Sequence, residues 1–209
     1  MKRKLLALTL CAGLALGLTA CGSSDPGQKL VGTWVCRYDY LDPILNEAVG
    51  GAEEMADYLS LDEFYIPMEL TFTKDGIITL TVIQDEMDEQ MENLKDAVLE
   101  ATLSYVEAEI GTQYQDLWDL DELLGLMGTS REDLAAELDE AMDPIMEELY
   151  QEAHEEGQYK ATEDMLYTST DVDTPAQETD GDPYTLDGDT LTLDLGEDAL
   201  GELTFTRAD

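Results

Sequence analysis

Residues 70–82 read Leu-Thr-Phe-Thr-Lys-Asp-Gly-Ile-Ile-Thr-Leu-Thr-Val, and this stretch decides the class of fold. Leu70 and Phe72 alternate with threonines before Asp75-Gly76, and apolar residues alternate again after it. Alternation with a period of two is typical of a half-buried strand. Asp-Gly is a preferred two-residue hairpin turn. The stretch therefore predicts an antiparallel β-hairpin.

The same pattern occurs on both sides of this hairpin. Residues 30–38 predict a strand in which Trp34, Cys36 and Tyr38 share one face. Residues 184–195 predict a second hairpin around Asp187-Gly188, and residues 203–205 predict a last strand. Residues 159–169 are a weaker strand, bent or split, and an acidic loop follows over residues 170–182.

Between the two hairpins the apolar period changes to about 3.6, which predicts helices. One apolar stripe consists of Met87, Met91, Leu94, Val98, Ala101, Tyr105 and Ala108. Gly111 ends this helix, and a short helix around residues 117–124 ends near Gly128. Ser130 and Asp133 form a capping-box pattern for a helix that reaches residue 149, with a kink expected at Pro144. We expect a helical insertion over residues 85–156, closed by Gly157, with Met87, Met91 and Met142 in its core.

An earlier helix is predicted from Asp42, as N-cap, to Leu59, with Pro43 at the first helical position. The N-terminal residues have a different pattern. Lys2, Arg3 and Lys4 precede an uncharged apolar run over residues 5–16, which is shorter than the roughly 20 residues of a membrane span. Residues 1–20 therefore predict a secretory signal peptide.

The end of this segment, Leu18-Thr19-Ala20-Cys21, resembles the bacterial lipobox. The resemblance implies cleavage before Cys21 and attachment of a diacylglycerol to its thiol. Residues 21–29 then form a polar tether, and residues 30–209 form the folded domain. The expected location is the outer face of the cytoplasmic membrane, with the lipid on Cys21 as the membrane contact.

The chain carries 49 acidic and 10 basic residues, a formal charge of −39. Nucleic-acid binding depends on basic side chains that displace counterions, so this class of function is excluded. Adhesion to anionic lipid headgroups is disfavoured for the same reason. The charge favours cationic partners or loosely held divalent ions.

Three motifs together resemble those of lipocalin-like lipoproteins of Gram-positive bacteria. They are Val31-Gly-Thr-Trp34, Leu70-Thr-Phe-Thr-Lys-Asp-Gly76 and Tyr184-Thr-Leu-Asp-Gly-Asp-Thr-Leu-Thr-Leu193. The resemblance implies an antiparallel barrel that starts with the Gly-x-Trp strand and has Trp34 packed across its closed end. It covers roughly residues 30–83 and 183–206, whereas the helical insertion departs from the family pattern.

The cysteine and histidine residues, which could be catalytic or metal-binding, are expected to have structural roles instead. Cys11 leaves with the signal peptide and Cys21 is lipidated, so Cys36 has no disulfide partner and is expected to be buried. His154 is expected to be an exposed helix-end residue, since the second histidine of a zinc-protease motif is absent. Because this single histidine is expected in a solvated acidic helix, a hydrolytic triad is not expected.

The acidic residues do not single out a metal or a catalytic site. Asp187-Gly188-Asp189 and Asp171-Val-Asp173 lack the spacing of a calcium-binding EF-hand, so they predict turns, with weak calcium binding as the alternative. A glycosidase would need one particular pair of carboxylates, and no pair stands out. We expect no metal and no cofactor.

The sequence therefore predicts an α+β domain, an antiparallel lipocalin-like β-barrel of about seven or eight strands with a helical insertion. The expected function is a lipid-anchored, non-enzymatic cell-envelope module that binds an unknown ligand. The alternatives are a protein–protein interaction module that uses the insertion, and an enzyme acting on cell-wall or other polysaccharide. Eight residues are expected inside the barrel, where they either line a ligand cavity or fill a solid core. They are Trp34, Tyr38, Leu70, Phe72, Leu80, Tyr184, Leu193 and Phe205.

Overall fold

The computed structural model describes residues 25–48, 57–110, 119–179, 181–196 and 199–208. The predicted signal peptide and Cys21 lie outside these residues. The described chain forms two compact units. Of the described residues, those within 25–38, 67–83 and 150–208 form the barrel unit, and those within 39–66 and 84–149 form the helical unit.

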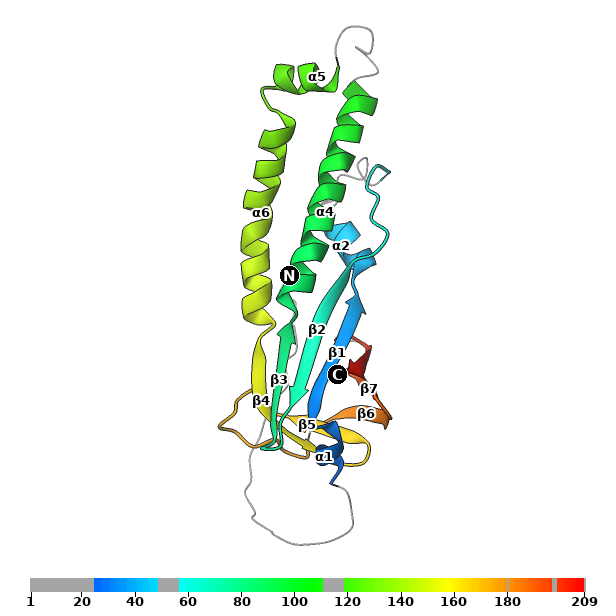
Figure 1. The fold of residues 1–209 in the computed structure, drawn as a ribbon, viewed down its shortest axis with the longest axis vertical. Coiled ribbons are helices and arrows are strands. Elements are labelled where there is room, and N and C mark those ends of the chain that lie inside the picture. The colour runs from blue at the N-terminus through cyan, green and yellow to red at the C-terminus, as the bar shows by residue number, and fades with distance from the viewer. Residues whose placement is uncertain (1–24, 49–56, 111–118, 180, 197–198, 209) are drawn as a thin grey trace. The chain divides into compact units, whose positions relative to one another are not determined.

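Eight antiparallel strands form a closed barrel in chain order, and β8 returns to pair with β1 (Figure 1). The predicted α+β barrel is therefore confirmed. The strands are β1 (Gly32–Asp39), β2 (Tyr65–Phe72), β3 (Ile77–Val82), β4 (Glu155–Ala161), β5 (Met165–Thr168), β6 (Asp182–Asp187), β7 (Thr190–Asp194) and β8 (Glu202–Arg207).

The hairpin predicted over residues 70–82 is confirmed as β2 and β3. Leu70 pairs with Leu80, and Phe72 pairs with Ile78. The turn places Gly76 at a φ of +80°, a conformation that glycine adopts at little cost. β2 starts earlier than predicted, at Tyr65. The second hairpin is confirmed as β6 and β7, with Leu186 opposite Leu191.

The weak strand predicted over residues 159–169 is split into β4 and β5. Strand β4 begins at Glu155, so Gly157 lies inside a strand and does not end the helical segment as predicted. A Cβ atom on Gly157 would lie 1.7 Å from the carbonyl oxygen of Ser169. Glycine is present here because another part of the backbone approaches closely, not because a helix ends.

A short helix, α1 (Pro26–Leu30), occupies part of the predicted tether and also includes Leu30, which was assigned to the first strand. The Asp25 carboxylate accepts a hydrogen bond from the amide of Gly27, which caps the helix. Leu30 is fully buried. The predicted polar tether therefore includes a short helix over residues 26–29.

The helical unit contains α2 (Leu41–Ala48), α4 (Gln84–Tyr105), the π-helix η1 (Val106–Ile110), α5 (Leu120–Met127) and α6 (Arg131–Glu152), the last of which ends in the barrel unit. The prediction of Asp42 as N-cap is wrong, because α2 already begins at Leu41, whose amide donates to the Asp39 carboxylate. The predicted extension to Leu59 is also wrong, since residues 57–59 are not helical; residues 49–56 lie outside the described part.

Helices α4 and α6 run side by side (Figure 1). Two ion pairs join them, Lys95–Asp139 at 2.7 Å and Arg131–Glu100 at 2.8 Å. Four members of the predicted stripe, Met87, Met91, Leu94 and Ala101, are buried, whereas Met142 is half-buried.

The predicted cap of α6 is confirmed. The Asp133 amide donates to the Ser130 hydroxyl, and that hydroxyl donates to the Asp133 carboxylate. Helix α6 continues through Pro144. Within the described residues, no helix has both the length and the apolar character needed to cross a membrane.

Candidate functional site

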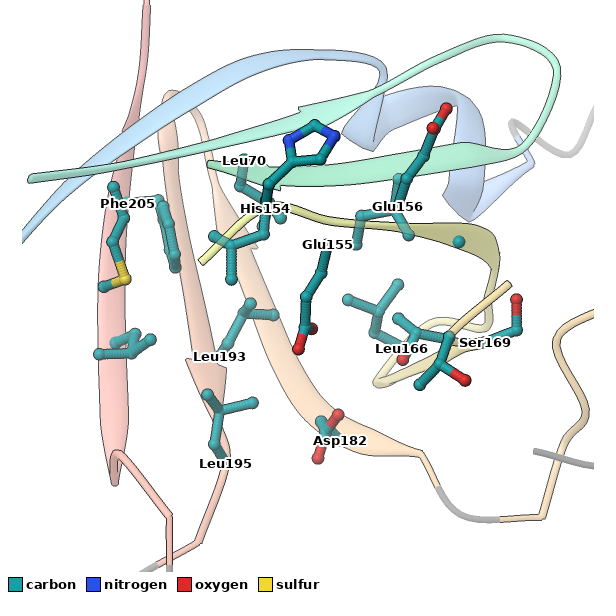
Figure 2. Close-up of a pocket in the computed structure, with 17 residues that line it drawn as sticks. Leu70, His154, Glu155, Glu156, Leu166, Ser169, Asp182, Leu193, Leu195 and Phe205 are labelled. Atoms are coloured by element: carbon teal, nitrogen blue, oxygen red, sulfur yellow. The ribbon is translucent and has the colours of Figure 1, made fainter. Parts of the chain in front are cut away.

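The barrel unit contains a cavity of about 240 Å³ that is partly open to solvent (Figure 2). Strands from around the barrel supply its wall, which is mostly aliphatic. The apolar lining residues are Met68, Leu70, Ile78, Leu80, Leu166, Leu193, Leu195, Leu203 and Phe205. Ligand sites are typically concave and mainly apolar, with a few polar groups that fix orientation.

Two carboxylates belong to the lining, and strand register explains why. Glu155 lies directly opposite Leu80, and Asp182 lies directly opposite Leu166. Residues opposite each other in an antiparallel pair project from the same face of the sheet. Both carboxylates therefore share the inner face with the leucines. Figure 2 shows Glu155 and Asp182 directed into the pocket, while Glu156 points to the other side of β4.

Hydroxyl groups also belong to the lining, on Thr168, Ser169 and Thr170. Thr168 follows buried Leu166 by two positions in β5, so both side chains face inward. Thr168 is only 5% exposed, and its Oγ1 atom has no hydrogen-bond partner. A buried hydroxyl without a partner costs free energy in the empty pocket.

The surroundings disfavour the charged forms of both acids. Burial raises the pKa of Glu155. Burial also raises the pKa of Asp182, and the nearby Asp194 carboxylate raises it further. Among the described ion pairs, none involves Glu155 or Asp182.

The opposite end of the barrel is packed. Trp34 is fully buried, and its Nε1 donates to the carbonyl of Leu30 at 2.8 Å. The Arg207 guanidinium lies 4.0 Å from the centre of the Trp34 ring and donates to the carbonyls of Val31 and Lys29. The carbonyl groups of Lys29 and Leu30 belong to α1, so this helix closes the end of the barrel.

Tyr159 strengthens the same closure. Its hydroxyl donates to the carbonyl of Thr73 at 2.9 Å and lies 3.3 Å from the carbonyl of Gly27. Its ring contacts Phe72 edge-to-face, with ring centres 4.9 Å apart. The Tyr159 side chain therefore links β4 to the turn after β2 and to α1 through a hydroxyl whose hydrogen bonds are satisfied.

The eight predicted interior residues divide between these two regions. Leu70, Leu80, Leu193 and Phe205 line the cavity. The other four do not line it: Trp34, Phe72 and Tyr184 are buried, and Tyr38 is half-buried. The two interpretations that the sequence left open, a ligand cavity and a filled core, thus each apply to one part of the barrel.

Sequence reasoning missed Glu155, Thr168 and Asp182. Glu155 was assigned to the helical insertion and Asp182 to the acidic loop, but both belong to strands. The available signal was the alternation of Glu155, Gly157 and Tyr159, which places them on one face once β4 is extended backwards.

The other candidates for chemistry have structural roles. Cys36 is buried, and burial raises the pKa of its thiol, partly offset by a hydrogen bond from the Thr204 backbone. His154 is exposed, as predicted. It was predicted at the end of a helix, but α6 ends at Glu152, so His154 lies just beyond the helix.

The two acidic motifs form turns, as predicted. Asp187 pairs with Thr190 across the β6–β7 turn, and the amide of Asp173 donates to the Asp171 carboxylate. Asp189 instead forms an ion pair with Arg207 at 3.6 Å. In the described part of the chain, no group of three or more His, Cys, Asp or Glu residues is arranged to hold a metal.

The helical unit has a groove of its own, about 500 Å³, along α4 and α6. Its lining combines apolar side chains with carboxylates, and the Lys95–Asp139 ion pair crosses it. The residues concerned include Asp88, Met91, Glu92, Asp96, Leu99, Leu138, Asp143 and Met146.

No family model, curated protein or solved structure matches this chain. The resemblance to lipocalin-like lipoproteins therefore stays a prediction, and the functional argument depends on the geometry of the barrel. That geometry is a pocket beside a packed end of the barrel, with a mostly apolar wall and two inward carboxylates.

Proposed function

We propose that this protein is a lipid-anchored, non-enzymatic module of the cell envelope that binds a small ligand inside its barrel. The observation that carries the proposal is the cavity, because a barrel of this size can be filled completely by side chains. Here the filled part is confined to the end near Trp34, and a space of about 240 Å³ lies among the residues beyond it.

The volume limits the size of the ligand. An engineered apolar cavity of about 150 Å³ binds benzene. A cavity of about 240 Å³ therefore has room for one ring with a short side chain, or for an aliphatic chain of similar size. The aliphatic wall would contribute affinity through the removal of apolar surface from water.

The binding test uses a probe of this size and a variant that fills the cavity. We expect 2-phenylethanol to shift NMR signals of the barrel and Leu80→Phe to abolish the effect. Thr79→Phe is the matched control, because Thr79 lies opposite Thr71 on the other face of the same strand. Probe binding that survives Leu80→Phe, or an absence of binding to the wild type, would contradict the proposal.

The anchor is tested separately. Cys21→Ser should move the protein from the membrane fraction to the soluble fraction, or leave an unprocessed precursor, because the lipid supplies the proposed attachment. Two acyl chains give stable membrane attachment, whereas one holds only marginally. Signal-cleaved Cys21→Ser protein that still sediments with membranes would contradict lipid anchoring at this residue.

A second candidate function is docking of a basic amphipathic helix from an envelope protein in the groove along α4 and α6. The observation in its favour is charge complementarity, since carboxylates of both helices surround an apolar floor. An amphipathic Lys/Leu peptide should bind, and Asp143→Lys should weaken it. A Glu/Leu peptide of equal length is the control, and equal binding of the two peptides would exclude this function.

A further inference from the structure

The cavity contains polar groups that the fold itself does not use. Strand alternation predicts apolar residues on the inner face, and nine aliphatic or aromatic side chains follow this rule. Glu155 and Asp182 break it, since each lies opposite a leucine on the inner face. Both carboxylates are half-buried, and partial removal of a charged group from water is costly unless the group is paired.

The arrangement differs from that of other polar groups in the barrel unit. The Ser169 hydroxyl, next to Thr168, accepts from the Gln158 amide and donates to the Asp171 carbonyl. The Tyr184 hydroxyl donates to the Thr162 carbonyl at 2.7 Å. The Thr168 residue is only 5% exposed, yet its hydroxyl has no hydrogen-bond partner. The orphaned hydroxyl and the two acids line the same cavity.

On the basis of the proposed function, we propose that the cavity selects a small organic cation. Its ligand has an apolar body that packs on the leucines and a protonated primary amine that pairs with a carboxylate of the lining, Glu155 or Asp182. An ammonium group has three hydrogen-bond donors and no acceptor. The pocket offers the carboxylates of Glu155 and Asp182 as acceptors, and the unpartnered Thr168 hydroxyl belongs to a residue of the same lining.

A bare metal ion fits the site less well than an organic cation. Calcium takes six to eight oxygen ligands at short distance. The pocket supplies two inward carboxylates and a few hydroxyl groups, and the rest of its wall is mainly aliphatic. An ammonium group attached to an apolar body uses both parts of this lining.

Amine binding should depend on pH. The titratable groups around the site are Glu155 and Glu156 on β4, His154 just before β4, Asp182 on β6 and Asp194 on β7. Because burial raises the pKa of Glu155 and Asp182, both carboxylates are neutralised at a higher pH than ordinary surface acids. Affinity for an amine should therefore fall as the pH is lowered through this range, while affinity for a neutral probe should not.

The test compares 2-phenylethylamine with 2-phenylethanol, which have similar size and differ in charge. Calorimetric titration of the full-length protein at neutral pH should give at least about tenfold tighter binding of the amine, a difference of about 1.4 kcal/mol. Glu155→Gln with Asp182→Asn should remove this preference and leave alcohol binding in place. Glu202→Gln is the matched control, because Glu202 is exposed on β8, opposite Asp194.

The outcomes separate this inference from the proposed function. Equal binding of the two probes by the wild type would overturn the amine inference and leave cavity binding intact. Binding of neither probe would overturn both. Thermal melting distinguishes a binding role from a structural one: Glu155→Gln should melt at the same or a higher temperature, since it removes a desolvated charge. A lower melting temperature with an unchanged probe preference would show that Glu155 supports the fold only, and would overturn its assigned role.

Discussion

The two ends of the barrel differ in whether their polar groups have hydrogen-bond partners. At the packed end, the Arg207 guanidinium donates to two backbone carbonyls and stacks on Trp34. In the cavity, two carboxylates and the Thr168 hydroxyl face aliphatic side chains without comparable partners. Both regions are built from the same strands, so the sheet alone does not explain the difference.

The comparison separates stability from binding. Satisfied polar groups around a fully buried aromatic residue stabilise the fold. Unsatisfied groups in a hollow region destabilise it, and such groups are typical of sites where function outweighs stability. Substitutions at the packed end should therefore change the free energy of unfolding, whereas substitutions in the cavity should mainly change ligand binding.

The largest expected effect is at Trp34. Trp34→Ala should lower the free energy of unfolding by about 3–5 kcal/mol, the range for removal of a buried large aromatic side chain. Denaturant titration measures this loss. Tyr38→Ala, on the same strand but only half-buried, should cost less. A loss below about 1 kcal/mol for Trp34→Ala would remove the contrast between the two ends.

A matched pair of enlarged side chains should give the next largest effect. Leu191 is fully buried outside the cavity lining, so Leu191→Phe should destabilise the protein by about 1–3 kcal/mol through overpacking. Leu80→Phe adds the same atoms next to empty space and should cost less. If chemical denaturation shows that the two variants lose similar amounts of unfolding free energy, the cavity has no room for a larger side chain in solution.

A conservative change at Arg207 should have a moderate effect. Lysine keeps the charge, but its ammonium group cannot reproduce the planar fork that contacts two carbonyls and the Trp34 ring. We expect Arg207→Lys to cost about 1 kcal/mol, the size of one net hydrogen bond. Lys160→Met, which removes an exposed ion pair with Glu178, is the control and should cost less than about 0.5 kcal/mol.

The smallest expected effect is a pH dependence that originates in the cavity. The folded-state pKa values of Glu155 and Asp182 are raised, so the folded protein takes up protons before the unfolded chain does. Stability should therefore increase as the pH falls from above these raised values toward the ordinary values of the two acids. The difference between melting curves of wild type and Glu155→Gln, Asp182→Asn isolates this contribution. A difference that does not vary with pH would contradict it.

The sequence predicted the barrel well because alternation and turn residues are local signals. Leu70, Phe72 and Asp75-Gly76 define one hairpin without reference to the rest of the chain. Helix α1 could not be predicted in this way, because it is only five residues long. Its carbonyl groups are bound by Trp34 and Arg207, and these contacts exist only in the folded barrel.

The candidate site was predicted only in its apolar half. Leu80 and Leu193 follow from alternation, and both line the cavity. Glu155 continues the acidic composition of the preceding helix, so composition gives no sign that a strand has begun. Its inward position depends on pairing with Leu80, which lies far away in the sequence. The boundary between helix and strand was therefore decided by a long-range contact.

The pairing of β3 with β4 has a consequence for how fast the chain folds. The residues between these strands form a long loop, and closing a long loop costs chain entropy. Helices α4 and α6 lie antiparallel within this loop and are joined by the Lys95–Asp139 and Glu100–Arg131 ion pairs. If this helical hairpin forms first, it brings the end of β3 and the start of β4 near each other before they pair. The long segment then acts kinetically as a short connection, and the β3–β4 ladder can form nearly as early as the two Asp-Gly hairpins.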